Sequence, residues 1–209
     1  SNKKFTIFLR NPKLIGFDFN HSHNDFFNFI LFCKGKKIIL DPGRENYSFD
    51  SLKRDISGKS HNSVSINNAA IYDEYLIYNL LYKLGFKNVE KCQYSINTNY
   101  KNYIKLTSLE KKFTIIRKIY LKDNYVSIID NIVTKKRSDV KLKLNLNMTR
   151  SDYKKNNQLK IFHDSKINNS NKIVKKKFYK SYGSSFEGSS LIVNFFNTNK
   201  IESCFKIKG

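Results

Sequence analysis

Short segments of apolar or alternating residues, separated by polar turns, make up most of the chain. Segments of this length and spacing predict an all-β fold, and their number favours an antiparallel β-sandwich with at most one short helix. The predicted strands are Phe5–Leu9, Phe26–Phe32, Lys37–Leu40, Ser63–Ile66, Tyr103–Thr107, Phe113–Leu121, Tyr125–Asn131, Val140–Asn147, Lys172–Phe178, Leu191–Phe196 and Ser203–Ile207.

Two of these segments also predict how strands are arranged. Lys122-Asp123-Asn124 is a short polar link between two predicted strands, which indicates a β-hairpin. Phe26–Phe32 is apolar at nearly every position, as is typical of a strand buried between two layers.

Two regions depart from the strand pattern. Ile71 and three later tyrosines recur at three- and four-residue intervals up to Leu84, and Gly85 could end a helix there. The resulting aromatic stripe is more typical of packing than of sugar binding. Ser151–Asn171, rich in Lys and Asn, is predicted to be a long exposed excursion with His163 on its surface.

Length and apolar content are those of one globular domain. The chain has 209 residues, 40% of them hydrophobic, which is enough for a substantial core, and residues 1–209 show no boundary or repeat. No apolar run approaches the roughly 20 residues needed to span a membrane. The first residues carry no secretory-signal pattern, and the sequence leaves the cellular location open.

The net charge of +22 favours an anionic partner. A polyuronate or a sulfated glycan would satisfy it, and so would a nucleic acid. Only six of the 39 basic residues are arginines, and arginine is the residue suited to bidentate phosphate recognition. A dedicated nucleic-acid reader is therefore disfavoured, and the abundance of Lys, Asn and Ile is equally explained by the base composition of the coding DNA.

Cysteine usage indicates neither a disulfide framework nor a thiolate metal site. Cys33, Cys92 and Cys204 are odd in number and widely spaced, with no Cys-x-x-Cys pair. We expect three free thiols, with Cys33 acting as a small buried hydrophobe.

Three of the four histidines fall in one short window, together with a carboxylate. His21 and His23 precede Asp41, and His61 follows it. Imidazole and carboxylate groups are zinc ligands, and a zinc site commonly uses three protein ligands. His23, Asp41 and His61 are therefore the candidate zinc ligands. His21, two residues from His23, would face the same cleft without having to bind the ion.

Each of these residues also has an ordinary interpretation, because a lone histidine is usually structural and an Asp before Pro-Gly commonly starts a turn. Geometry adds an objection to the zinc hypothesis. If Lys34-Gly35 is a hairpin turn, Asp41 lies opposite Asn28, roughly 16 Å from His23 at strand rise. A bend or bulge near Asn24 would have to close that gap.

The same window resembles the C-terminal β-domain of heparinase II/III-like polysaccharide lyases. The resemblance rests on His21-Ser22-His23-Asn24-Asp25, an apolar strand, a glycine turn, a second strand ending in Asp41-Pro42-Gly43, then Tyr47 and His61-Asn62-Ser63-Val64. That order and spacing are similar to the family pattern over about fifty residues, and a fainter likeness continues through Phe113–Asp130. The resemblance implies a supersandwich-like fold.

The resemblance also implies roles for particular residues. His23, Asp41 and His61 would bind zinc, while His21 and Tyr47 would face the sugar as catalytic groups. Arg44 and Arg54 are the candidate substrate contacts. The family often carries an arginine five residues before the later histidine, where this chain has Ile56, so the contacts of that loop differ from the pattern.

The implied activity is β-elimination on a uronic-acid-containing polysaccharide. It removes the proton next to the carboxylate and expels the 4-oxygen, for which His and Tyr are suitable proton carriers. Elimination needs no activated water, so the zinc would be structural. The family places further catalytic groups on an N-terminal helical toroid that these 209 residues do not contain, and we expect the chain to be inactive alone.

Two other function classes stay open. A non-catalytic glycan-binding or assembly module could retain the same fold, and Tyr47 pointing away from the His21 cleft would favour it. A cupin-like metal enzyme also carries His-x-His and a later histidine. Cupins usually place a glutamate soon after the pair, whereas this chain has Phe26, Phe27 and Asn28, which disfavours that class.

Overall fold

The computed structural model describes residues 4–9, 26–43, 45–46, 48, 57–70, 84, 93–99, 103–109, 112–149, 151, 161–164, 169–181 and 184–208. The regular elements among these residues are antiparallel strands and one turn of 3-10 helix, η1 (Gly58–Ser60). The predicted all-β sandwich is confirmed.

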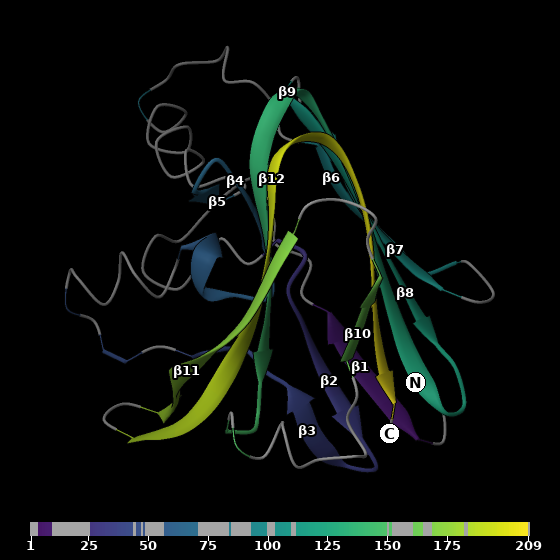
Figure 1. The fold of residues 1–209 in the computed structure, drawn as a ribbon. Helices are drawn as coiled ribbons and strands as arrows, with labels where there is room; N and C mark the ends of the chain where they lie inside the picture. Colours follow the sequence, from purple (N-terminus) through teal and green to yellow (C-terminus); the bar gives the residue numbers. More distant parts are fainter. Residues whose placement is uncertain are drawn as a thin grey trace.

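Two long strands organise the molecule. β9 (Tyr125–Leu146) and β12 (Ser184–Lys208) pair along most of their lengths and arch together over one end of the fold (Figure 1). Their register shifts between Phe195 and Lys200, where Asn197 adopts a positive φ of 47°. Bulges of this kind bend a strand, so each long strand contributes to both layers of the sandwich.

The first layer is built on the first half of β9 and the second half of β12. β8 (Phe113–Leu121), β7 (Ile104–Leu109) and β6 (Gln93–Asn97) extend it on the β9 side. On the other side, β10 (Ile161–Asp164) pairs with β12. The predicted hairpin at Lys122–Asn124 is confirmed, because it joins β8 to β9.

The second layer is built on the other halves of the same two strands. β11 (Asn169–Ser181) pairs with β12, while β4 (Val64–Ile66) and β3 (Lys36–Ile39) pair with β9. β5 (Ala69–Ala70) extends β4, and β2 (Phe29–Cys33) and β1 (Phe5–Leu9) extend β3.

One hydrophobic core fills the space between the layers. Ile128 and Phe205 from the first layer and Leu144 and Val193 from the second belong to the same buried cluster. Because side chains alternate along a strand, the outward positions between these residues are left for polar groups. The candidate site is made from such positions.

The hairpin of β2 and β3 follows its turn chemistry. Lys34 and Gly35 both have positive φ, 48° and 75°, as a two-residue turn of type I′ requires. The predicted start of this strand at Phe26 is wrong. Phe27 also has a positive φ, 64°, and β2 begins at Phe29.

Elsewhere, strand positions were largely predictable and strand lengths were not. Each of the predicted segments overlaps an observed strand. However, β9 and β12 are each one continuous strand where two separate strands were predicted. The prediction of an exposed excursion over Ser151–Asn171 is wrong in part, since Ile161–Asp164 forms β10 against β12. The helix predicted from Ile71 lies outside the described residues apart from Leu84.

Two further observations concern the described part of the chain. It contains no helix long and apolar enough to cross a membrane. Of the cysteines expected to be free thiols, Cys33 and Cys204 are free, and Cys92 lies outside the described residues.

Candidate functional site

A fully buried ion pair between β8 and β9 holds the loops that form the candidate site. Arg117 of β8 lies opposite Asp130 of β9 in the strand register, and both side chains are 0% exposed. The guanidinium donates to both carboxylate oxygens, from Nε to Oδ1 at 2.6 Å and from Nη2 to Oδ2 at 3.0 Å. This bidentate geometry is among the strongest hydrogen-bonded pairings of side chains.

The remaining donor of Arg117 connects two loops that are distant in sequence. Its Nη1 donates to the carbonyl oxygens of Phe27, at 2.9 Å, and Asn62, at 3.0 Å. The guanidinium carbon also lies 5.9 Å from the centroid of the Phe27 ring and 5.7 Å from that of Phe29. These contacts hold Phe27 in its left-handed conformation and fix the backbone on both sides of the site.

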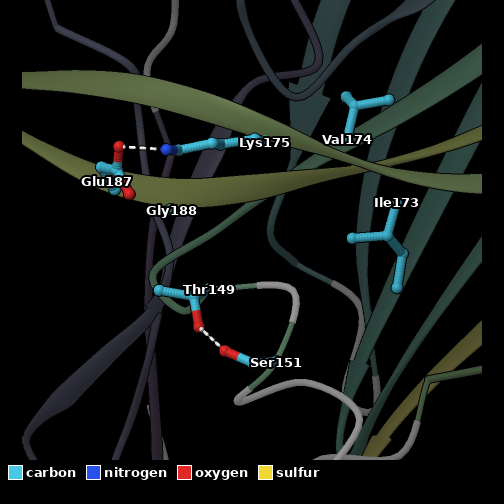
Figure 2. A pocket seen from close by; sticks show the side chains of 7 residues that line it. All are labelled: Thr149, Ser151, Ile173, Val174, Lys175, Glu187 and Gly188. Atoms are coloured by element: carbon cyan, nitrogen blue, oxygen red, sulfur yellow. Dashed lines mark hydrogen bonds and ion pairs between the residues drawn. The ribbon is translucent and has the colours of Figure 1, made fainter.

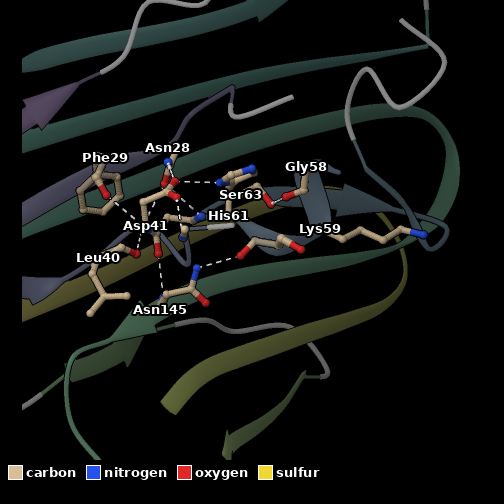
Figure 3. A network of polar contacts seen from close by, with 12 residues as sticks. Asn28, Phe29, Leu40, Asp41, Gly58, Lys59, His61, Ser63 and Asn145 are labelled. Carbon is tan, nitrogen blue, oxygen red and sulfur yellow. Dashed lines mark hydrogen bonds and ion pairs between the residues drawn. The ribbon is translucent and has the colours of Figure 1, made fainter. Parts of the chain in front are cut away.

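The side-chain amide of Asn62 continues this network of hydrogen bonds, and the residues that it contacts are labelled in Figure 3. Its Nδ2 donates to Asn28 Oδ1 at 2.9 Å, to the Phe29 carbonyl at 2.8 Å and to the Leu40 carbonyl at 3.0 Å. Its Oδ1 accepts from the backbone N–H of Asn145 at 2.6 Å. One buried amide therefore joins β2, the end of β3 and β9.

Asp41 lies at the end of this chain of contacts. Asn28 Nδ2 donates a short hydrogen bond to Asp41 Oδ2, and the N–H of Gly43 donates to Oδ1 at 3.0 Å. His61 Nδ1 lies 2.8 Å from the same Oδ2, and the histidine side chain is fully buried. The structure thus brings together two of the three predicted zinc ligands.

The backbone next to Asp41 is equally constrained. The N–H of Tyr179, in β11, donates to the carbonyl of Pro42 at 2.9 Å. Gly43 has a φ of 70°, and a Cβ there would overlap the carbonyl oxygen of Tyr179. Only glycine fits, which explains why the Asp-Pro-Gly segment ends the strand at this place.

The turn that carries His61 is supported by β9. Lys143 Nζ donates to the carbonyls of Lys59 and Ser60, at 2.6 and 3.2 Å, and Asn145 Nδ2 donates to Ser60 at 2.9 Å. These are the carbonyls at the end of η1, which have no partner within so short a helix. Lys143 therefore helps to position His61 through the backbone.

The environment of Lys143 disfavours its charged form. Burial, followed by the neighbouring amine of Lys176 and by Lys141, lowers the pKa of Lys143 from 10.5 to about 6, and Asp41 offsets this only in part. At neutral pH the Lys143 amine is therefore largely uncharged while it donates to the carbonyls of η1.

The Asp41–His61 contact can be compared with the requirements of zinc. The pair offers one oxygen and one nitrogen ligand, and 2.8 Å is shorter than the roughly 3.3 Å expected between two ligands of a tetrahedral zinc. A small outward movement of either side chain would make room for the ion. Among the described residues no group of three His, Cys, Asp or Glu is placed to hold a metal.

The other predicted site residues cannot be placed. His21, His23, Arg44, Tyr47 and Arg54 all lie outside the described residues, as does the bend predicted near Asn24. The predicted proximity of Asp41 to Asn28 is confirmed by their hydrogen bond.

Sequence reasoning missed the polar groups that hold the site together. A signal for Arg117 was present: in Ile115-Ile116-Arg117-Lys118-Ile119 it takes an inward position between two buried isoleucines, and the hairpin register places Asp130 opposite. No comparable signal marks Asn62, because its role depends on carbonyls brought in from other strands.

A separate cavity of about 550 Å3 lies between Thr149 and Ser151 and the strands β11 and β12 (Figure 2). Its polar side chains interact with one another: Lys175 with Glu187, and the Thr149 hydroxyl with that of Ser151 at 2.7 Å. Neither Asp41 nor His61 lines it, so the cavity is not part of the candidate site.

Fold and contacts together define an antiparallel β-sandwich domain in which a buried histidine, His61, contacts the partly exposed carboxylate of Asp41. Residues 3–173 match the family described as heparinase II/III-like, C-terminal, and the chain belongs to that family. The resemblance found in the sequence is therefore confirmed. The chain matches none of the curated proteins with which it was compared.

Solved structures with the same fold include lyases. The heparan sulfate lyase HepC from Pedobacter heparinus is 15% identical, with a TM-score of 0.63 over 90% of this chain and 31% of that one. A heparinase III described as the BT4657 gene product is 17% identical, with a TM-score of 0.69 over 94% of this chain and 31% of its own. The chain therefore spans about a third of the length of these proteins.

Removal of one partner of the buried ion pair should be far more costly than removal of both. Arg117→Met leaves the Asp130 carboxylate buried without its guanidinium, for which we expect a loss of about 3–5 kcal/mol in the free energy of unfolding. The double variant Arg117→Met/Asp130→Leu removes both charges and should recover part of that loss. Urea denaturation of the two variants and the wild type measures the difference.

Arg117→Lys is the matched control, because it keeps the charge but not the bidentate geometry or the bonds to Phe27 and Asn62. It should also be destabilised. Equal losses in the single and double variants would show that the carboxylate is not what makes the single variant unstable.

Lys143 should make stability depend on pH above neutrality. Between pH 10.5 and about 6 the unfolded state binds a proton at this lysine and the folded state does not, so its unfavourable contribution grows as pH falls through that window. Relative to wild type, Lys143→Met should therefore gain stability between pH 9.5 and pH 6.5. Lys172→Met, which removes a lysine that is not among the causes of this shift, is the control. A pH-independent difference between Lys143→Met and wild type would contradict the assignment.

Proposed function

We propose that this chain is the β-sandwich portion of a polysaccharide lyase that cleaves an anionic, uronic-acid-containing polysaccharide by β-elimination. The observation that carries the proposal is the contact between Asp41 and His61 in a chain of the heparinase II/III-like family. The solved proteins of similar fold, described as a heparan sulfate lyase and as heparinase III, support the same substrate class.

The proposed site combines the Asp41–His61 pair with residues outside the described part of the chain. His21 and Tyr47 would exchange protons with the sugar during elimination, and Arg44 and Arg54 would contact its acidic groups. Hydrogen bonds from Asn28 and Asn62 fix the positions of Asp41 and His61. The four loop side chains would be positioned relative to this fixed pair.

Zinc is the cofactor that fits the donor set, with His23, Asp41 and His61 as its ligands. Its contribution would be structural, because β-elimination requires no activated water. By linking the segment of His23 to the Asp41–His61 pair, the zinc ion would hold the sugar-facing loops in place.

The proposed partner is the helical toroid domain of a full-length enzyme. The similar lyase structures are about three times as long as the part that this chain covers, so there is room in them for a further domain. In this proposal residues 1–209 form a single domain that supplies one wall of the sugar cleft and is inactive alone.

A non-catalytic glycan-binding or assembly module is the alternative, since a fold does not establish activity. It would keep the Asp41–His61 pair for structural reasons alone. The cupin hypothesis loses its support, because the chain belongs to another family.

The zinc assignment predicts about one zinc ion per chain in protein prepared without a polyhistidine tag. The double variant His23→Ala/His61→Ala should lose it, whereas His163→Ala, a change of the histidine in β10, should not. Elemental analysis after exhaustive dialysis measures the content. Wild-type protein without metal, even after zinc is supplied, would exclude the proposed ligands.

The lyase assignment predicts activity only when the chain is joined to its helical domain. In that enzyme, His21→Ala and Tyr47→Phe should each lower kcat by about 10²–10⁴-fold, the usual contribution of a proton-transfer group. The ultraviolet absorbance of the unsaturated uronate product measures the rate. Unchanged rates in both variants would favour the non-catalytic module.

A further inference from the structure

The outward face of the first layer carries three tyrosines that the proposed function does not use. Tyr103 immediately precedes β7, Tyr120 lies on β8 and Tyr125 begins β9. All three are partly exposed. Because Ile119 and Val126, the strand neighbours of Tyr120 and Tyr125, are buried in the core, these two tyrosines point to the opposite face of the sheet.

The tyrosine rings contact one another and two lysines. The ring centroids of Tyr103 and Tyr120 lie 5.0 Å apart, with 38° between the ring planes. Lys118 Nζ lies 5.4 Å from the centroid of the Tyr103 ring, and Lys206 Nζ lies 5.7 Å from that of Tyr125. Such a contact holds an ammonium group over a ring and leaves it N–H groups with which to bind an anion. We call the surface formed by these five residues the tyrosine face.

Strand register places these side chains next to one another. Tyr120 pairs with Ser127 of β9, which pairs with Lys206 of β12. Lys118 lies two residues before Tyr120 on β8. The backbones of the two lysines are therefore two strand spacings and two residues apart, roughly 12 Å. An acidic polymer lying across the strands could contact both.

Further lysines border this face. Lys105 of β7 pairs with Lys118, and Lys208 lies two residues after Lys206 on the same side of β12. Within the described part of the chain neither Lys118 nor Lys206 has a carboxylate partner. An anion bound between them would be attracted by all four ammonium groups.

The acidic residues of this region lie toward its margins. Over the outward positions of residues 103–107, 114–120, 125–133 and 202–208, Glu202 is the one acidic residue, and it is four residues from Lys206, roughly 13 Å at strand rise. Asp164 of β10 pairs with Cys204 in the register. Asp123 lies in the turn between β8 and β9, next to Lys122. The lysines therefore outnumber the carboxylates.

The tyrosine face and the candidate site are on different sides of the first layer. Arg117, which bonds to the loops of the candidate site, points inward from β8, and its neighbour Lys118 points outward. In Figure 1, β7 and β8 lie on the other side of the arch of β9 and β12 from β4, the strand that follows His61. A ligand on the tyrosine face would thus be bound outside the sugar cleft.

An acidic glycan fits this combination of groups. One face of a sugar ring presents mainly C–H groups, which can pack on an aromatic ring, while the phenol hydroxyl can hydrogen-bond to the sugar hydroxyls. Carboxylate or sulfate groups at the ring edge accept charge-assisted hydrogen bonds from lysine. The cations of this face are lysines and not arginines, which disfavours bidentate recognition of nucleic-acid phosphates.

We propose that the tyrosine face is a second glycan-binding site. Sugar rings pack on Tyr120, and Lys118 and Lys206 donate hydrogen bonds to acidic groups of the same chain. The ligand class rests on the proposed function. Holding a distant part of a polymer at this second site would raise the effective concentration of its other segments at the Asp41–His61 site.

A pair of charge-matched variants tests the lysines. Lys118→Met/Lys206→Met removes both from the tyrosine face. Lys37→Met/Lys177→Met is the control, because these lysines also lie over aromatic rings, 5.7 Å from the centroids of Phe32 and Tyr179, but on the second layer. Both variants lower the net charge equally, so general attraction to a polyanion changes equally in both.

Binding to the 209-residue chain would be measured by calorimetry at about 0.15 M salt, where long-range attraction is largely screened. The probes are an unsulfated uronate oligosaccharide, a sulfated neutral polysaccharide and a single-stranded DNA. The first two distinguish a carboxylate from a sulfate as the bound group. We expect the Kd for at least one glycan to rise roughly tenfold or more in the Lys118/Lys206 variant, since it loses two charge-assisted contacts. The control should change that Kd much less.

A change without any loss of charge tests the ring. Tyr120→Leu keeps an apolar side chain on β8 and should raise the same Kd about threefold or more, because the aromatic surface is lost. Phe8→Leu is its control, since Phe8 is also an exposed aromatic residue, on β1. An unchanged Kd in Tyr120→Leu would contradict the packing of a sugar ring on this tyrosine.

The possible outcomes separate this proposal from the proposed function. Equal weakening in the two lysine variants, with glycan binding by the wild type, would overturn the second site and leave the lyase assignment standing. Failure of the wild type to bind either glycan would also overturn the second site, while the lyase assignment would still be decided by the rate of the enzyme that contains the helical domain. Loss of DNA binding alone in the Lys118/Lys206 variant would reassign the surface to a nucleic acid.

Loss of folding in the double variant would not end the test. Lys206 is exposed, and so is Lys177. Lys206→Met and Lys177→Met then form the matched pair, and the same difference in Kd is expected, reduced to one lysine. Thermal unfolding of each variant confirms that the compared proteins are folded.

Discussion

The buried guanidinium of Arg117 is the constraint on which the site depends. A charge in the core is tolerated only where its counter-ion and hydrogen-bond acceptors are all in place. Asp130 supplies the counter-ion, and the carbonyls of Phe27 and Asn62 supply the acceptors. Satisfying one side chain therefore brings two loops to the same point, and through Asn62 and Asn28 it sets the position of Asp41 and His61.

The same stretch of β9 serves the core and the surface at once. In Lys141-Leu142-Lys143-Leu144-Asn145-Leu146 the leucines are buried between the layers, and the alternate residues point outward. Asn145 and Lys143 support the turn of η1 by donating hydrogen bonds to its carbonyls. The strict alternation of a strand thus keeps the polar functions in register with the packing of the core.

Periodicity was sufficient to predict the fold class and most strand positions, because burial of one face is a local pattern. It failed at Phe26 and Phe27, where the chain turns because Arg117, 90 residues away, binds the Phe27 carbonyl. It also failed to show that β9 and β12 continue through their bends, since polar residues at a bend resemble those of a loop. The pairing of Asp41 with His61 was inferred from residue types and a family pattern, and the amides that enforce it left no local signal.

The arch of β9 and β12 has a consequence for how the protein unfolds. Because each strand crosses from one layer to the other without interruption, both layers are hydrogen-bonded to the same two strands. Opening one layer would disturb β9 and β12, on which the strands of the other layer also depend. We therefore expect the two layers to behave as one cooperative unit, with backbone amides on both sides of the sandwich exchanging their hydrogens only when the whole domain opens.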